Sequence, residues 1–234
     1  MGEEATRAHR LYRVMALQIE QAGYAVLRFD YSGTGDSAGA DADATVDAWL
    51  SDIECAVDEL RAASGASQVL AVGLRMGGLL AALAEQRGCV HFQHLVLWDP
   101  VIDGLGYLRG LADAHRTFMQ DEMAPASWQD HLRIDERGIA DQVLGMQLNS
   151  ELIDEMAAVD LTTVLPRAGN VTVICTRDSV AMSRLRQGLS STPSARWIDM
   201  NSSSDWNSDA ALNSATVPMD VVQTVVGRIR ECSP

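Results

Sequence analysis

Short apolar runs alternate along this chain with longer stretches in which apolar residues recur every three or four positions. A short run bounded by glycine or polar turn residues indicates a buried strand, and the helical spacing indicates an amphipathic helix. The expected strands lie near residues 24–30, 68–73, 94–98, 170–175 and 195–199. The expected helices between and around them cover residues 6–22, 44–63, 76–88, 182–190 and 217–232.

The alternation of strand and helix predicts an α/β fold, with a mostly parallel sheet and helices on both of its faces. Residues 101–168 break this alternation, since they carry mixed charge and only short helical patterns at 105–119 and 139–146. We therefore expect residues 1–100 and 169–234 to form the core. Residues 101–168 are expected to form a mostly helical cap inserted between two strands.

The charge of the chain excludes some classes of binding partner. The 234 residues suit one domain of this kind. The net charge is −14, and all 18 basic residues are arginine. No basic block is present to bind nucleic acid or an anionic membrane surface. No apolar run approaches the ~20 residues of a membrane span. The first residues, MGEEATRAHR, carry no secretory signal, so we expect a cytoplasmic protein.

No metal or cofactor is expected. The four cysteines are scattered, with no C-x-x-C pair, and the five histidines form no H-E-x-x-H set. The glycine-rich run GTGDSAG (33–39) lacks the G-K-[ST] ending of a phosphate loop and the register of a dinucleotide-binding turn. The cysteines are expected to be reduced and mostly buried.

One motif points to chemistry. The run GLRMG (73–77) follows an expected strand and opens an expected helix, with the glycine spacing of the G-x-S-x-G nucleophile elbow of serine hydrolases. The middle position, which that chemistry fills with serine, is Arg75. A guanidinium stays protonated at working pH and cannot attack a carbonyl. The glycines still let strand and helix approach, so we expect the turn itself to form.

The motifs VLRFDYSGTGDSAG, GLRMGG, LVLWDPVIDG and VICTRD, in this order, resemble the α/β-hydrolase superfamily along nearly the whole chain. The run GEEATRAHRLYR…LRFDYSGTGDS…GLRMG…LWDPV is more similar still to the exosortase A system-associated hydrolases of type 2, which are associated with bacterial exosortase and exopolysaccharide gene clusters. In that subgroup the elbow is likewise Gly-Leu-Arg-x-Gly.

The resemblance also implies strands before the first helix, one of them between residues 24–31 and 68–74 of the sheet. The chain begins just after that strand. Either the start codon is placed too late, or the chain is a fragment, or the sheet closes over the missing strand. A homo-oligomer or a strand-donating partner could also cover the row of backbone groups that would otherwise stay open.

The resemblance implies a triad acid at Asp178 or at Asp99, although capping the next helix or holding the turn before Pro100 would equally explain these aspartates. It implies a histidine around residues 202–209, where the chain reads SSSDWNSD. Nucleophile and base are both missing at their expected positions, and losing either removes most triad catalysis. Ser32, Ser37 and Ser179 are candidates for a displaced nucleophile, but the first two are typical turn formers, and Ser179 has no histidine near it in the sequence.

Arg75 also places a cation at a helix N-terminus, where the dipole disfavours it by roughly 0.3–1 kcal/mol. We therefore expect a carboxylate partner. Glu3 and Glu4 are the first choice, because the loop before the first helix borders the elbow in the family that the chain resembles. Asp99 and Asp178 are the second choice. The arginine then either closes a degenerate site through an ion pair or binds an anion such as a carboxylate, phosphate or sugar acid.

Two functions remain open. The first is a non-catalytic member that binds a ligand or a protein in a bacterial exopolysaccharide or exosortase system. The second is an active ester or thioester hydrolase, or an acyltransferase, with an unusual residue set. A small-molecule ester or anionic ligand suits both. Met76, next to Arg75 in the elbow, is a further candidate binding residue.

Overall fold

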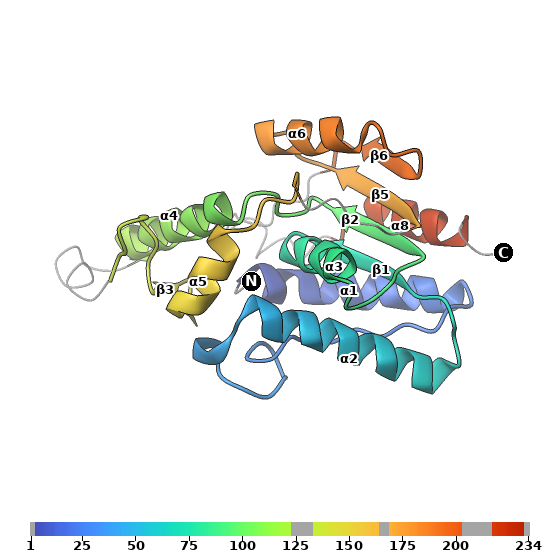
Figure 1. The fold of residues 1–234 in the computed structure, drawn as a ribbon, viewed down its shortest axis with the longest axis horizontal. Helices are drawn as coiled ribbons and strands as arrows, with labels where there is room; N and C mark the ends of the chain where they lie inside the picture. Colours follow the sequence, from blue (N-terminus) through green and yellow to red (C-terminus); the bar gives the residue numbers. More distant parts are fainter. Residues whose placement is uncertain (1–2, 123–132, 164–168, 203–216, 232–234) are drawn as a thin grey trace.

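The computed structural model describes residues 3–122, 133–163, 169–202 and 217–231. A four-stranded sheet forms its centre, with the order β1-β2-β5-β6 and all neighbours parallel. These strands are β1 (Leu70–Leu74), β2 (His94–Trp98), β5 (Asn170–Cys175) and β6 (Ala195–Asp199). The predicted parallel sheet is confirmed for these four strands (Figure 1).

Helices cover both faces of the sheet, as predicted. On one face, α1 (Glu3–Gln21) and α8 (Met219–Arg230) pack with Val96 and Trp98 of β2 in one apolar cluster. On the other face, Leu95 and Leu97 join the larger cluster, because successive side chains of a strand point to opposite sides. The helices of that cluster include α2 (Val46–Ser64), α3 (Met76–Arg87) and α6 (Val180–Leu189), which lie against this face of the sheet.

The expected strand at residues 24–30 is wrong. This segment has neither helix nor strand structure, and all residues from 25 to 30 are exposed. It leaves α1 through Gly23 at φ 95° and runs alongside that helix (Figure 1). The part of the chain that the structure describes holds no strand beside it. An apolar run becomes a strand only when a neighbour satisfies its backbone groups, and that neighbour is not among these residues.

The expected helix at 139–146 is also wrong. Residues Gln142–Val143 (β3) and Met146–Gln147 (β4) form a small antiparallel hairpin. Its two turn residues are Leu144 at φ 47° and Gly145 at φ 82°, and positive φ at both positions is what a type I′ hairpin turn requires. The helix comes later, at α5 (Ser150–Ala157), where the Asn149 side chain accepts from Leu152 N–H.

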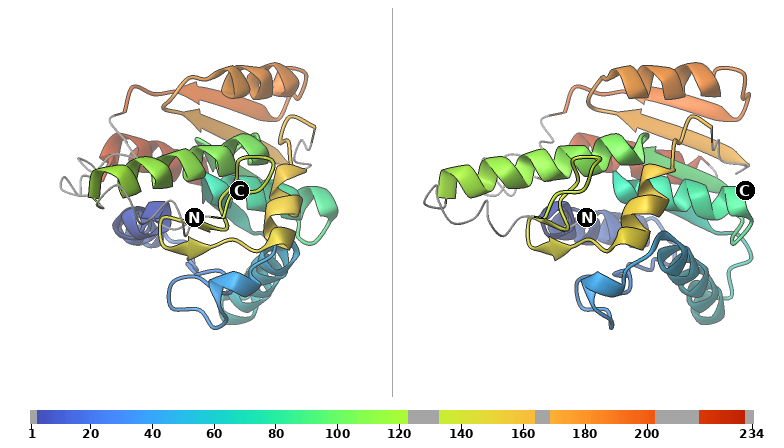
Figure 2. Two further views of the ribbon diagram at one scale, coloured as in Figure 1. Left: turned by 90° about the vertical axis from the view of Figure 1, so that its left-hand side faces the viewer. Right: turned by 60° about the vertical axis from the view of Figure 1, so that its left-hand side comes forward.

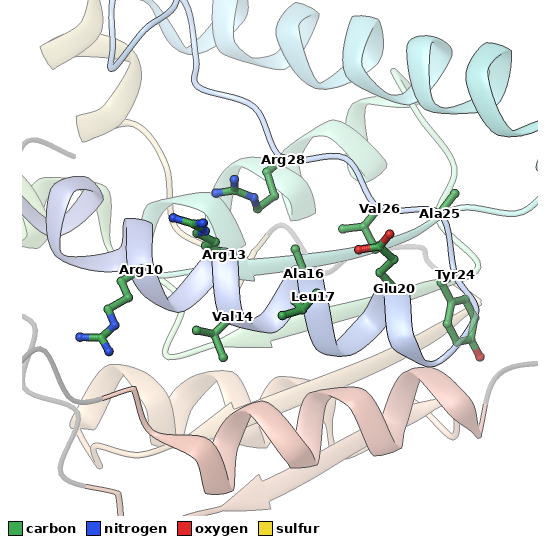
Figure 3. A pocket seen from close by; sticks show the side chains of 10 residues that line it. All are labelled: Arg10, Arg13, Val14, Ala16, Leu17, Glu20, Tyr24, Ala25, Val26 and Arg28. Atoms are coloured by element: carbon green, nitrogen blue, oxygen red, sulfur yellow. The ribbon is translucent and has the colours of Figure 1, made fainter.

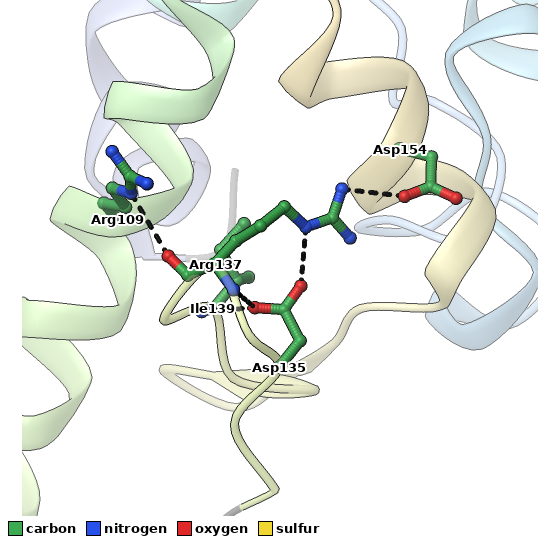
Figure 4. A network of polar contacts seen from close by, with 5 residues as sticks. All are labelled: Arg109, Asp135, Arg137, Ile139 and Asp154. Carbon is green, nitrogen blue, oxygen red and sulfur yellow. Dashed lines mark hydrogen bonds and ion pairs between the residues drawn. The ribbon is translucent and has the colours of Figure 1, made fainter.

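The segment between β2 and β5 lies beyond the carboxyl ends of the strands (Figures 1 and 2). It contains α4 (Gly104–Glu122), the hairpin and α5. Arg137 joins them, since its guanidinium bonds to Asp135 at 2.7 Å and to Asp154 of α5 at 2.8 Å. Its carbonyl accepts from Arg109 of α4 at 3.2 Å (Figure 4). This network holds the loop before the hairpin against both helices.

A single turn of 3₁₀ helix, η1 (Asp41–Asp43), precedes α2. Asp41 of this turn accepts from the backbone N–H of Gln147 in β4, which ties the glycine-rich loop to the hairpin. None of the described helices combines the length and the apolar character that crossing a membrane requires.

Candidate functional site

The elbow turn forms as expected. Arg75 sits between β1 and α3 at φ 53° and ψ −117°, a strained conformation for a residue with a side chain. A Cβ on Gly73 would lie 2.5 Å from Gly77 O and from Gly78 Cα, and one on Gly78 would lie 3.0 Å from Gly73 O. Glycine at 73 and 78 therefore allows β1 and α3 to approach closely. Position 77 is less crowded, since its Cβ would meet only Tyr12 Oη at 3.8 Å.

Arg75 binds Glu4. Its Nε donates to Glu4 Oε1 at 3.2 Å, and its Nη1 lies 3.5 Å from the carbonyl oxygen of Asp99. The side chains are 25% and 10% exposed, so the ion pair is largely shielded from water. The carboxylate partner expected for the Arg75 cation at the start of α3 is therefore present. It is Glu4, in the first turn of α1.

Tyr107 completes this cluster, and sequence reasoning missed it. Its hydroxyl donates to Glu4 Oε2 at 2.7 Å, and the Arg75 guanidinium carbon lies 5.8 Å from the ring centroid. The residue stands on α4, in a stretch whose pattern indicated only a helix. A tyrosine on the buried side of a helix needs a polar partner for its hydroxyl, and that need was the available signal.

The charges of the cluster follow from its contacts. Burial alone would raise the pKa of Glu4, but the terminal amine, Arg75 and the hydrogen bond from Tyr107 together hold it below 4.5. Burial, reinforced by the Glu4 charge, raises the pKa of Tyr107 well above 10. At neutral pH the cluster thus holds an ionised carboxylate that accepts from a guanidinium on one oxygen and from a neutral phenol on the other.

The side chains of the other predicted site residues make no described contact with the Arg75 guanidinium. Asp99 is 3% exposed, at φ 39°, and its carboxylate accepts from the backbone N–H and hydroxyl of Thr176, so it links the ends of β2 and β5. Exposed Asp178 accepts from Ser183 at 3.4 Å and does not contact Arg75. The Met76 side chain is buried in the core. Glu3 begins α1, and its side chain lies outside the described residues.

The three serines that are candidates for a displaced nucleophile all make local hydrogen bonds. Ser32 donates through its N–H and its hydroxyl to Asp52, each at 2.8 Å. The hydroxyl of Ser37 donates to Asp30 O at 2.5 Å. Ser179 caps α6 by accepting from Met182 N–H at 3.1 Å. Residues 203–216, which include most of the stretch expected to hold a triad histidine, lie outside the described residues.

The three cysteines that the structure describes offer no nucleophile near the elbow either. Burial, with a smaller contribution from the Asp99 charge, raises the pKa of Cys175 to about 11, so this thiol stays protonated at neutral pH. Cys55 is exposed, contrary to the expectation of mostly buried thiols, and Cys89 is half-buried.

Comparison with solved structures supports the fold. A structure of the metagenome-derived lipolytic enzymes LipS and LipT is 18% identical, with a TM-score of 0.64 over 94% of this chain and 88% of that chain. Est1E from Butyrivibrio proteoclasticus, solved with ferulic acid, is 16% identical, with a TM-score of 0.64 over 95% and 84%. A thermophilic esterase from Thermogutta terrifontis is 18% identical, with a TM-score of 0.57 over 95% and 86%.

A search of curated protein sequences gave no match. The family model described as serine aminopeptidase, S33, matches residues 1–163. This family is broader than the exosortase-associated type that the sequence resembles, and the narrower assignment stays a prediction. The matched residues include the elbow and Tyr107, and the solved neighbours share the parallel sheet with its covering helices. The chain therefore belongs to the serine aminopeptidase S33 family of α/β hydrolases.

Proposed function

We propose that this protein binds the carboxylate of a small anionic ligand at the elbow and does not hydrolyse it through residue 75. The observation that carries this proposal is the convergence of Arg75 Nε and Tyr107 Oη on the two oxygens of one carboxylate. Arginine with a second donor is a common way to bind a carboxylate. In this interpretation the Glu4 carboxylate fills the anion site when no ligand is bound.

Displacement of Glu4 is the step that opens the site. Glu4 is the second residue of α1, and the first turn of a helix has no preceding turn to hold it. If this turn frays, the Glu4 carboxylate leaves and a ligand carboxylate takes its two donors. Residues 101–168 then act as a cap, because Tyr107 closes the site from α4. The proposed place in bacterial exopolysaccharide or exosortase systems rests on the sequence resemblance alone.

Titration calorimetry with butyrate tests this proposal, with neutral butyramide as the control ligand. Glu4→Ala removes the internal carboxylate, so we expect it to bind butyrate about tenfold more tightly than the wild type. Arg75→Met should bind neither compound. Failure of Glu4→Ala to bind butyrate, or equal binding of butyramide, would overturn the proposal.

A second candidate is hydrolysis of an ester or thioester, or acyl transfer, by an unusual residue set. Family membership and the esterase neighbours favour this candidate over a non-catalytic protein. The residues around Arg75 favour the first, because the elbow carries no hydroxyl or thiol. Turnover of p-nitrophenyl butyrate that a fluorophosphonate abolishes by labelling one serine would establish the second candidate. No turnover and no labelling would exclude a serine mechanism.

A further inference from the structure

Two residues with a strained main chain face each other at the elbow. In the part of the chain that the structure describes, the residues other than glycine with a positive φ are Arg75, Asp99 and Leu144. Leu144 lies in the hairpin turn, where positive φ is required. Asp99, at φ 39°, also precedes Pro100, and a proline pushes the residue before it toward extended conformations with negative φ. Such strain persists only where surrounding contacts impose it, and it is concentrated at functional sites.

The stretch after β2 holds the main chain of the elbow. Arg75 N–H donates to Trp98 O at 3.0 Å, and Arg75 O accepts from Val101 N–H at 3.1 Å. A Cβ on Gly78 would lie 3.2 Å from the Cβ of Pro100, so the same stretch also packs closely against the start of α3. These contacts fix the main-chain position of Arg75.

The stretch after β2 also contacts the Arg75 side chain. The carbonyl oxygen of Asp99 lies 3.5 Å from Arg75 Nη1, while Arg75 Nε donates to Glu4 Oε1 at 3.2 Å. A guanidinium is a planar and rigid group, so a contact at Nη1 helps to set the direction in which the Nε–H points. The position of the Asp99 carbonyl therefore affects how the guanidinium meets a carboxylate.

The side chain of Asp99 anchors this carbonyl to a different strand. Asp99 N–H donates to Ile174 O at 2.9 Å. The Asp99 carboxylate accepts from Thr176 N–H at 2.7 Å and also from the Thr176 hydroxyl. Asp99 is 3% exposed, so water competes little with these hydrogen bonds. The strained conformation of Asp99 is thus held by β5 and by the loop that follows it.

We propose that Asp99 is a positioning residue, which is anchored by Thr176 and holds the Arg75 guanidinium in the orientation that binds a carboxylate. Glu4 supplies this carboxylate in the structure. The extension of the role to a bound ligand rests on the proposed function, whereas the orientation of Arg75 toward Glu4 does not. The role differs from that of a triad acid, because the Asp99 carboxylate acts through its own main chain and not on a histidine.

NMR of the arginine Nε–H groups tests this role with no ligand present. The Arg75 Nε–H bonds to a side chain that is 10% exposed, so its proton should exchange slowly with water. Arg75→Met should remove this signal. Arg13→Met is the control for the assignment, because Arg13 is also close to α1 residues but lines the groove between α1 and residues 24–28, whose lining does not include the elbow (Figure 3). It should leave the signal in place.

Two substitutions at position 176 separate positioning from stability. Thr176→Val removes the hydroxyl that donates to the Asp99 carboxylate, and we expect the Arg75 Nε–H to exchange at least about tenfold faster. Thr176→Ser keeps a hydroxyl and should restore the wild-type rate. Ser179→Ala, in the same loop, removes the side chain that caps α6 and should lower stability with no change in this rate.

Titration calorimetry extends the test to a ligand. In a Glu4→Ala background, Thr176→Val should weaken butyrate binding at least about tenfold, and Ser179→Ala should leave it unchanged. If Glu4→Ala itself binds no butyrate, the proposed function is refuted, and the exchange rates still decide the role of Asp99. That role would be overturned by an unchanged exchange rate in Thr176→Val, by failure of Thr176→Ser to restore the rate, or by equal acceleration in Ser179→Ala. Butyrate affinity that Thr176→Val leaves unchanged would overturn its extension to a ligand.

Discussion

Two apolar runs of similar composition adopt different structures in this molecule: one is a buried strand, and the other is an exposed segment without helix or strand structure. In β2, the residues His94–Trp98 are all 0% exposed, paired with β1 on one edge and β5 on the other and covered by a cluster on each face. In the 24–31 segment, the run AVLRF has comparable apolar character, yet every residue from 25 to 29 is exposed.

The difference lies in neighbours and not in composition. Both runs carry the branched and aromatic side chains that favour strands, but that preference reflects packing against a pleated surface. β2 has a paired strand on each side, so its backbone groups are satisfied and its side chains are enclosed. The 24–31 segment has α1 beside it and no strand from the described residues, so its residues 25–30 stay exposed. Four measurements test or sharpen this comparison.

The largest effect should come from truncating one leucine in each run. Leu97→Ala in β2 should lower the free energy of unfolding by about 2–5 kcal/mol, because it leaves a cavity in a fully buried site. Leu27→Ala, at 40% exposure, should cost less than about 1 kcal/mol. Urea unfolding of both variants measures the contrast. Equal losses would mean that the 24–31 segment is buried in solution.

The pH dependence of stability should reveal the burial of His94, the first residue of β2. Burial, with a smaller contribution from Arg228, lowers its pKa to about 4, although Glu231 opposes the shift. An unfolded histidine titrates near 6.5, so between pH 6.5 and 4 only the unfolded state takes up this proton. The contribution of neutral His94 to stability is complete above pH 6.5. About 3 kcal/mol of the free energy of unfolding is lost as the pH falls from 6.5 to 4.

Urea midpoints of the wild type and of His94→Gln between pH 4 and 7 measure this effect. Glutamine can still bond to Thr172, which His94 Nε2 meets at 2.9 Å, but it does not titrate. The variant should therefore have a flatter profile in this window. An identical slope in the two proteins would contradict the assignment to His94.

Arg75 follows β1, which pairs with β2 on one edge and has no strand from the described residues on the other. Arg75→Met removes the guanidinium donor from the Glu4 carboxylate, and it should cost about 1–3 kcal/mol. Arg75→Glu should lower the melting temperature further, because it places two carboxylates together. Thermal melts at neutral pH decide this. If Arg75→Glu is as stable as the wild type, the ion pair with Glu4 does not hold the elbow.

The smallest effect is expected at Phe29, which is 42% exposed and lies edge-on to Tyr31 with ring centroids 5.1 Å apart. Phe29→Ser should change the free energy of unfolding by about 1 kcal/mol or less, since it loses one aromatic pair at the surface. The same variant should be more soluble in concentrated salt. A loss as large as that of Leu97→Ala would place Phe29 in a core.

Much of this architecture could be predicted from the sequence. β1, β2, β5 and β6 were found because each is a short apolar run whose neighbours are other runs of the same kind. The strand expected at 24–30 failed because local apolarity does not report whether a partner strand is present. The helix expected at 139–146 failed because Leu144 and Gly145 adopt positive φ, which turns the same apolar residues into a hairpin.

Part of the candidate site could also be predicted from the sequence. A cation at a helix start needs a carboxylate, so a partner for Arg75 could be expected, and Glu4 provides it. Tyr107 could not be placed, because its role depends on how α4 crosses the end of the sheet. Asp99 has a buried carboxylate engaged by Thr176, a tertiary contact between two strand ends that no spacing in the sequence encodes.

The outer edge of β1, which has no neighbouring strand in the described part of the chain, also has a colloidal consequence. Two copies of the protein could meet through such edges, and an edge that binds any strand is a route to aggregation. The net charge of −14 opposes this encounter, because like-charged molecules repel before short-range pairing can begin. The protection depends on ionic strength and weakens toward the isoelectric point near 4.6. The acidity of this chain thus slows the approach of two copies to each other.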